Sequence, residues 1–186
     1  MNDLFTKLKK IFVGIPPEPK VENFSEQQAR HRQNALAFAK QQQRLFSAKQ
    51  REKDLWQIRF GKQQAAELNQ LSGTEFEKYL AGLLQQLGYL VELTPSTGDY
   101  GADLLLSKDG LRIAVQAKCY TGSVGVAAVQ EALSGMAYYQ CQSAWVITTG
   151  NYTNNAIELA RQSKVRLINS TEIGKWITLI NDTTGR

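Results

Sequence analysis

Residues 102–118 read ADLLLSKDGLRIAVQAK and carry the pattern that decides the fold. Two runs rich in strand-forming residues flank Asp109-Gly110, a dipeptide that strongly favours a two-residue turn between antiparallel strands. If these two residues form the turn, Lys108 pairs with Leu111 and the remaining register follows from that pair. The stretch therefore predicts a β-hairpin with strands at residues 102–107 and 111–120.

This register brings three polar residues onto one face of the hairpin. Asp103 is directly opposite Gln116, with Cβ atoms about 5 Å apart, and Lys118 is the diagonal neighbour. Because side chains alternate along a strand, Val115 and Ala117 point to the other face. A slip of one residue would destroy the arrangement, so the expectation depends on the turn.

A carboxylate, an amide and an ammonium group suit metal-assisted hydrolysis of a phosphodiester. Mg²⁺ prefers oxygen ligands, which Asp103, Gln116 and the Ala117 backbone carbonyl supply. Lys118 is placed to orient or help deprotonate the attacking water, or to stabilise charge in the transition state. From the spacing alone, however, a solvated polar face with a weak ion pair is the more common reason for such residues.

A helix is predicted directly before the hairpin. Ser72-Gly-Thr-Glu75 is a capping box, an apolar stripe follows it to Leu87, and Gly88 ends the helix. Glu77 is at the rim of the apolar stripe, about 20° in azimuth from Leu84. Its carboxylate is therefore expected to reach past the sheet edge and to contact a metal through water.

The rest of the C-terminal region alternates helices and strands. Further strands are expected at residues 89–93, 144–149 and 165–169, and helices at about 124–138, after Thr153 and after Ser170. A meander followed by alternating elements predicts an α/β fold, with a mixed central sheet flanked by helices on both faces.

Residues 1–69 differ in texture and are predicted to form a basic, Gln-rich helical region. Residues 1–70 contain 13 Lys/Arg and 7 Asp/Glu, a net charge of +6, whereas residues 71–186 have a net charge of −1. The excess suggests contact with a polyanion, and a solvated basic helix is an equal alternative. A short amphipathic helix is expected at 4–12 and a Pro-rich linker at 16–19. We place the boundary of a second domain at residue 70.

Several classes of protein are excluded by missing residues. His31 is the only histidine, which removes histidine-centred nucleases and Ser/His or Cys/His catalysis. The sequence has neither a P-loop nor a Gly-rich dinucleotide motif, so no small-molecule cofactor is expected. Two cysteines, no long apolar span and no secretory signal predict a cytoplasmic protein.

Four segments in consistent order resemble the catalytic domain of Mrr-type restriction endonucleases, within the PD-(D/E)xK nuclease superfamily. The similarity extends from residue 71 to about 175, and the segments are Phe76-Glu77, Gly98-Asp-Tyr-Gly-Ala-Asp103, Val115-Gln-Ala-Lys118 and Ala144-Trp-Val-Ile-Thr-Thr149. By this resemblance Asp103 matches the first metal-binding acid, and Gln116 the position that is often Gln in this branch. Lys118 matches the catalytic lysine, and Glu77 the carboxylate of the first core helix.

The resemblance implies a restriction-endonuclease-like αβββαβ core in residues 70–186 and Mg²⁺-dependent cleavage of DNA, with Mn²⁺ able to substitute. Gln116 supplies no charge, which implies modest metal affinity. Residues 1–69 do not resemble the winged-helix DNA reader of the type member, so recognition of methylated DNA is not supported.

Two other functions stay open at this point. The chain could be a DNA-binding module derived from a nuclease that cuts weakly or not at all, or its N-terminal helices could dock a partner. The sequence also leaves open whether the protein is a homodimer. For the amphipathic segment at 4–12, packing on the protein itself is favoured over a membrane-surface or protein contact.

Overall fold

The computed structural model describes residues 23–60, 65–95 and 97–184. Contacts divide the chain into a unit at residues 1–50 and a unit at residues 51–186. In the first unit every described residue belongs to or adjoins the helix α2 (Phe24–Phe60) and is exposed. The amphipathic segment expected at 4–12 and the linker at 16–19 lie outside the described residues. Within the described ranges, no helix is both long and apolar enough to cross a membrane.

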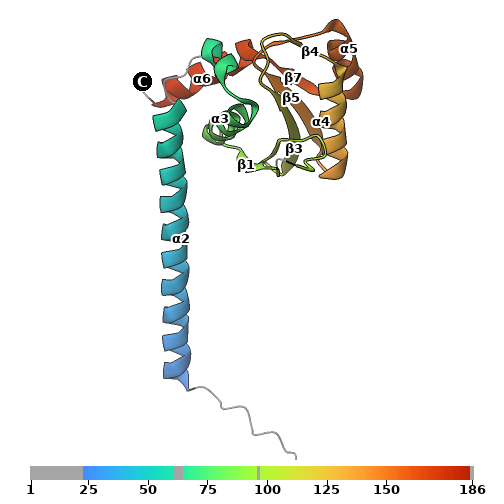
Figure 1. Ribbon diagram of the computed structural model, residues 1–186. Coiled ribbons are helices and arrows are strands. Elements are labelled where there is room, and N and C mark those ends of the chain that lie inside the picture. Colours follow the sequence, from blue (N-terminus) through green and yellow to red (C-terminus); the bar gives the residue numbers. More distant parts are fainter. Residues whose placement is uncertain (1–22, 61–64, 96, 185–186) are drawn as a thin grey trace, which may run out of the picture. The chain divides into compact units, whose positions relative to one another are not determined.

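The main elements of the unit at 51–186 follow the order expected from the sequence (Figure 1). After the end of α2, its elements are η1 (Ala65–Gln70), α3 (Gly73–Gln86), β1 (Leu90–Leu93), β2 (Leu104–Lys108), β3 (Leu111–Lys118), β4 (Ser123–Val124), α4 (Val126–Tyr138), β5 (Ser143–Thr148), β6 (Asn151–Tyr152), α5 (Asn154–Ser163), β7 (Arg166–Ile168) and α6 (Ser170–Thr184).

The predicted mixed sheet is confirmed, with strand order β1-β2-β3-β5-β7. The first three strands form an antiparallel meander, and β5 and β7 join it in parallel. The sequence did not predict a second sheet, in which the two-residue strands β4 and β6 pair in parallel. These strands are too short to show a periodic pattern, so only the folded chain reveals them.

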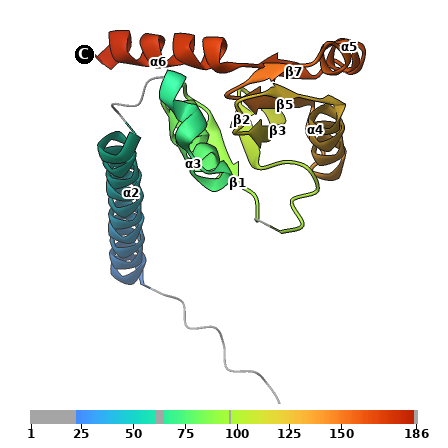
Figure 2. The same ribbon diagram turned by 45° about the horizontal axis from the view of Figure 1, so that its top comes forward.

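Helices cover both faces of the five-stranded sheet (Figure 2). On one face, α3 and α6 pack on a core that includes Leu104, Val115 and Ile147. On the other face, α4 and α5 pack on Ala144 and Val146. Since alternate residues of one strand supply the two cores, β2, β3 and β5 are buried on both sides, as their near-continuous apolar sequences indicate.

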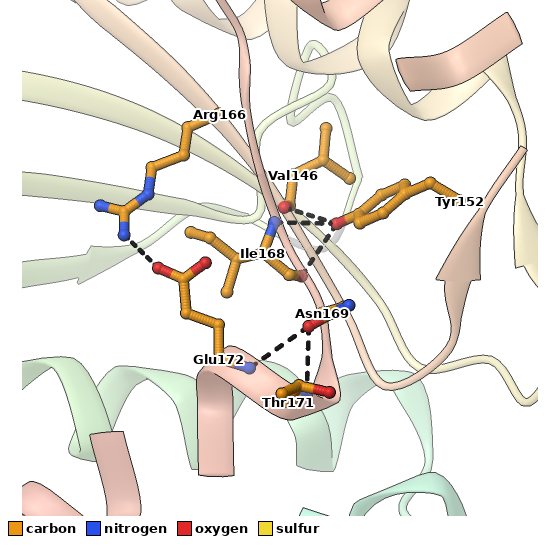
Figure 3. Close-up of polar contacts among 7 residues, drawn as sticks. All are labelled: Val146, Tyr152, Arg166, Ile168, Asn169, Thr171 and Glu172. Atoms are coloured by element: carbon orange, nitrogen blue, oxygen red, sulfur yellow. Dashed lines mark hydrogen bonds and ion pairs between the residues drawn. The ribbon is translucent and has the colours of Figure 1, made fainter. Parts of the chain in front are cut away.

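The helix starts follow from local hydrogen bonds. The capping box at Ser72 and Glu75 is confirmed in both directions, and Thr153 caps α5 through Ala156 N. The cap predicted at Ser170 is wrong by one residue. Asn169 caps α6 instead, because its side-chain oxygen accepts from Thr171 N at 3.1 Å and Glu172 N at 3.2 Å (Figure 3).

Just before this cap, the Tyr152 hydroxyl bridges two neighbouring strands. It makes hydrogen bonds with Val146 O at 2.7 Å and with the backbone of Ile168 (Figure 3). Burial raises the pKa of Tyr152, so the hydroxyl stays protonated and able to donate. The contact ties β6 to the ends of β5 and β7.

The end of α2 contributes to the core of the unit at 51–186. Trp56 Nε1 donates to Tyr79 O at 3.0 Å, and the Phe60 ring packs edge-on against the Tyr79 ring. Phe60 and Leu68 are both buried in the core cluster formed with α3 and α6. Residues before position 70 therefore pack as part of this unit, and contacts place its start at Arg51.

Candidate active site

The β2–β3 hairpin has the turn and register that the sequence predicts. Asp109 and Gly110 have φ values of 51° and 79°, as a two-residue hairpin turn with positive φ at both positions requires. Lys108 pairs with Leu111, and the register continues to Leu104 opposite Val115. The ladder departs from this register at Asp103, because its N–H donates at 2.8 Å to the carbonyl of Val115, the residue that already pairs with Leu104.

The Asp103 carboxylate contacts the residues expected opposite it. Its Oδ2 accepts from Gln116 Nε2 at 2.5 Å and from the Ala117 backbone N–H at 2.7 Å. Gln116 Nε2 also approaches Ala117 O at 3.4 Å. Gln116 is 5% exposed, so its amide is held in place, whereas Asp103 is half-buried. The structure thus brings three of the predicted residues together.

Unneutralised negative charge gathers around Asp103. Burial raises its pKa most, the Ala117 N–H and Lys118 lower it, and Asp99 and Glu131 raise it. The pKa of Glu77, half-buried on α3, is raised by burial and then by Asp103 and Asp99. Glu77 therefore lies within electrostatic reach of Asp103, although no hydrogen bond joins it to the other predicted residues in the part of the chain that the structure describes.

Lys118 ends β3 and is held by a residue of α4. Its Nζ lies 2.7 Å from Glu131 Oε2. That oxygen is buried and accepts no directed hydrogen bond, so the contact is an ion pair.

The backbone of Lys118 is fixed from the neighbouring parallel strand. Thr148 Oγ1 donates to Lys118 O at 2.7 Å, and Thr148 is fully buried. Thr149 N also donates to Lys118 O, at 3.3 Å. A hydroxyl buried in this way is not available to contact a phosphate.

Asp99 forms a turn with the three residues that follow it. Ala102 N donates to Asp99 O at 3.1 Å, and Gly101 N donates to Asp99 Oδ1 at 3.0 Å. The carboxylate still raises the pKa of both Asp103 and Glu77. Asp99 thus shapes the loop before Asp103 and adds to the negative potential around it.

The oxygen donors around Asp103 fit a hard divalent cation. Carboxylate, amide and backbone carbonyl oxygens are the ligands that Mg²⁺ prefers, and the mutual repulsion of Asp103, Asp99 and Glu77 favours a bound cation. No group of three or more His, Cys, Asp or Glu side chains with metal-binding geometry occurs among residues 23–60, 65–95 and 97–184. Binding would therefore have to use the Gln116 and Ala117 oxygens as well.

A mixed sheet whose antiparallel hairpin presents Asp, Gln and Lys at one end defines the restriction-endonuclease-like class. The family model of the Mrr catalytic domain, described as a restriction endonuclease, matches residues 68–177. The chain belongs to this family of restriction endonucleases. The family assignment supports a nuclease, as the resemblance in the sequence implies. No curated protein matches the sequence.

Three solved structures are similar to parts of the chain, and it spans 35% to 63% of their lengths. AF1548, a protein of unknown function, has a TM-score of 0.46 and 15% identity over 57% of this chain and 63% of its own. The DNA modification-dependent restriction endonuclease AspBHI has a TM-score of 0.49 and 18% identity over 74% of this chain and 35% of its own. The restriction endonuclease MspJI, solved in complex with a 27-mer oligonucleotide, has a TM-score of 0.38 and 20% identity over 73% of this chain and 35% of its own.

Sequence reasoning missed two partners of the predicted site residues, Glu131 and Thr148. Both come from elements that follow the hairpin, and their contacts depend on how α4 and β5 pack on β3. A signal existed for Thr148, because the parallel strand β5 is an apolar run that ends in Thr148-Thr149. For Glu131, the helical pattern predicts only a position at the rim of the apolar stripe, and it does not identify Lys118 as the partner.

Proposed function

We propose that the protein is a divalent-metal-dependent DNA endonuclease that hydrolyses phosphodiester bonds at the Asp103 end of the β2–β3 hairpin. The observation that carries the proposal is the contact of the Asp103 carboxylate with Gln116 and Ala117, one residue before Lys118. Membership of the restriction endonuclease family supports the same reaction. Action on DNA also fits the cytoplasmic location expected from the sequence.

Asp103, Gln116 and the Ala117 carbonyl would hold Mg²⁺ or Mn²⁺, and Glu77 would contact it through water. When bound, the cation supplies Lewis acidity and neutralises charge on the phosphate. In the structure, the Gln116 amide directs its N–H group at Asp103. Gln116 must therefore turn its amide to offer an oxygen on the same side.

Lys118 supplies the positive charge that the reaction needs near the phosphate. Thr148 fixes its backbone and Glu131 holds its Nζ, so the ammonium group is positioned before substrate arrives. A positioned ammonium can orient the attacking water or stabilise the transition-state charge without reorganisation.

A second candidate is a DNA-binding module that cuts weakly or not at all. Gln116 favours it, because an amide stands where the wider superfamily has an acid and already satisfies Asp103 by hydrogen bonding. In that case the basic region at 1–50 would carry most of the affinity for DNA.

Plasmid cleavage tests the proposal and separates the two candidates. Purified protein should nick or linearise supercoiled DNA with Mg²⁺ or Mn²⁺ and not with EDTA. Asp103→Asn and Lys118→Met should abolish cutting. Asp109→Asn is the matched control, since it changes an Asp of the same hairpin at a turn position that Asn tolerates. Metal-independent binding with no cutting of plasmid, genomic or modified DNA would favour the binding module.

A further inference from the structure

Two exposed tyrosines lie beside the candidate active site and take no part in the chemistry proposed for it. Tyr100 is in the loop before Asp103 and is 52% exposed, and Tyr138 ends α4 and is 54% exposed. Their rings are stacked, with centroids 3.6 Å apart and planes 14° from parallel. Tyr139 supports this pair by packing edge-on against Tyr138 at 4.9 Å. The fold thus holds two aromatic rings together at the surface.

The backbone at Tyr100 has a conformation that tyrosine disfavours. Tyr100 and Gly101 are the central residues of the turn from Asp99 to Ala102, and their φ values are 51° and 91°. Such turns favour Gly, Asn or Asp at both central positions. A Cβ at residue 101 would lie 2.3 Å from Glu131 O, so only Gly fits there. At position 100, by contrast, the chain carries a large aromatic residue despite the strain.

Contact between the two rings does not explain this strain. A near-parallel, face-to-face arrangement at this separation is the one that ring quadrupoles disfavour. Both residues also leave about half of their surface in water. Strained, exposed residues of this kind occur at sites where a ligand uses them.

The tyrosine pair and the candidate catalytic residues lie along one stripe of α4. Glu131, the partner of Lys118, is seven residues before Tyr138 in the same helix. Seven residues bring the two side chains to within about 20° in azimuth and about 10 Å along the axis. The loop from Asp99 to Ala102 follows this stripe, since it touches α4 at Glu131, at Gly135 and at Tyr138.

We propose that Tyr100 and Tyr138 form a stacking platform for an unpaired nucleobase of the bound nucleic acid. This inference rests on the proposed function and names a subsite of the same site. Aromatic rings stack on any base, and each stack contributes substantially to affinity. In an intact duplex the faces of each base are covered by its neighbours, so the platform selects a base that is unpaired.

Binding without metal tests the platform separately from cleavage. Fluorescence anisotropy in EDTA should compare a short oligothymidine with an abasic strand of the same length. The wild type should prefer the strand with bases by about 5- to 150-fold, the range of a single base–aromatic stack. Tyr100→Asn should lose most of this preference while keeping its affinity for the abasic strand, and Tyr100→Phe should keep the preference.

The two variants are matched. Asn suits the positive φ at position 100, so Tyr100→Asn removes the ring without disturbing the turn, and Phe keeps the ring without the hydroxyl. Tyr138→Ala, on the helix, should lose the preference in the same way. A preference retained by both Tyr100→Asn and Tyr138→Ala would overturn the proposal, as would a wild type that binds both strands equally.

Failure of the platform and failure of the nuclease proposal give different results. Asp103→Asn should lose cleavage and keep the preference for bases. A protein that never cuts DNA but shows a Tyr100-dependent preference would keep the platform and refute the nuclease. A protein that cuts plasmid but shows no preference for the strand with bases would support the nuclease and refute the platform.

Discussion

The half-buried carboxylate of Asp103 lies within electrostatic reach of Asp99, Glu131 and the Lys118 ammonium group. Its pKa is raised from the ordinary 3.8, chiefly by burial. When the pKa of an acid is higher in the folded than in the unfolded state, the protein loses stability as pH rises through the interval between the two pKa values. Ionised Asp103 therefore destabilises the fold at neutral pH, a cost that a cation site explains.

Asp103→Asn should accordingly raise the free energy of unfolding at pH 7.5, by about 1 kcal/mol. Asn keeps an acceptor for Ala117 N–H and removes the charge. The gain should disappear below about pH 4, where the wild-type carboxyl is protonated. Thermal melts between pH 3 and 8 measure both effects. A lower melting temperature for Asp103→Asn at pH 7.5 would contradict the electrostatic account.

Glu131 is expected to position Lys118 for catalysis rather than to stabilise the fold. Glu131→Gln should lower kcat about 10-fold or more, as loss of a residue that orients a catalytic group commonly does. It should change stability by less than about 1 kcal/mol, because the ion pair is partly exposed. KM for DNA should change little.

Glu158→Gln is the control for this prediction. It removes an ion pair with Arg161 on α5, which is also exposed. Cleavage rates for the two variants, measured beside their melting temperatures, give the comparison. Equal kcat for wild type and Glu131→Gln would show that Lys118 is held by its own strand.

At the scale of elements, α6 depends on a cap that comes from the preceding residue. Asn169→Ala removes the hydrogen bonds to Thr171 N and Glu172 N and should cost about 1 kcal/mol. Ser170→Ala, at the position that the sequence indicated, should change the free energy of unfolding by only about 0.5 kcal/mol or less. Urea unfolding of both variants measures the difference. A larger loss for Ser170→Ala would show that the cap is at residue 170.

At the scale of the whole molecule, the folded nuclease unit is expected to begin near Arg51. A chain of residues 51–186 should melt at the temperature of the full protein. A chain of residues 70–186 lacks the partly buried Trp56 and the buried Phe60 and Leu68, and fully buried side chains of this size contribute about 2–5 kcal/mol each. It should therefore melt far lower or fail to fold. Equal melting temperatures for the two shortened chains would restore the boundary at residue 70.

The same shortened chain tests what the basic region contributes. Residues 1–50 contain nine Lys/Arg and four Asp/Glu, and those described are all exposed. The chain of residues 51–186 should bind DNA less tightly and with a shallower dependence on salt, because fewer phosphates are neutralised. Binding titrations at several salt concentrations measure the slope. An unchanged slope would assign residues 1–50 to another partner.

Local sequence is enough to predict the hairpin turn, the order of the main elements and the register from Lys108–Leu111 to Leu104–Val115. These features depend on turn chemistry, capping residues and the alternation of side chains, all of which act between residues close along the chain. These local features predict the class of fold. They also predict the contact between Asp103 and Gln116 and the position of Lys118 directly after Ala117, which donates to Asp103. The electrostatic influence of Asp103 on Glu77 agrees with its predicted position at the helix rim.

The surroundings of these residues depend on packing between elements that are far apart along the chain. The Lys118–Glu131 ion pair, the Thr148 bond to Lys118 and the Tyr100–Tyr138 stack each join elements whose separation depends on how α4 and β5 pack on the sheet. The same holds for Trp56, Phe60 and Leu68, which move the start of the core before residue 70. Side-chain periodicity gives the face on which a residue lies, and only packing determines which residue of another element meets it there.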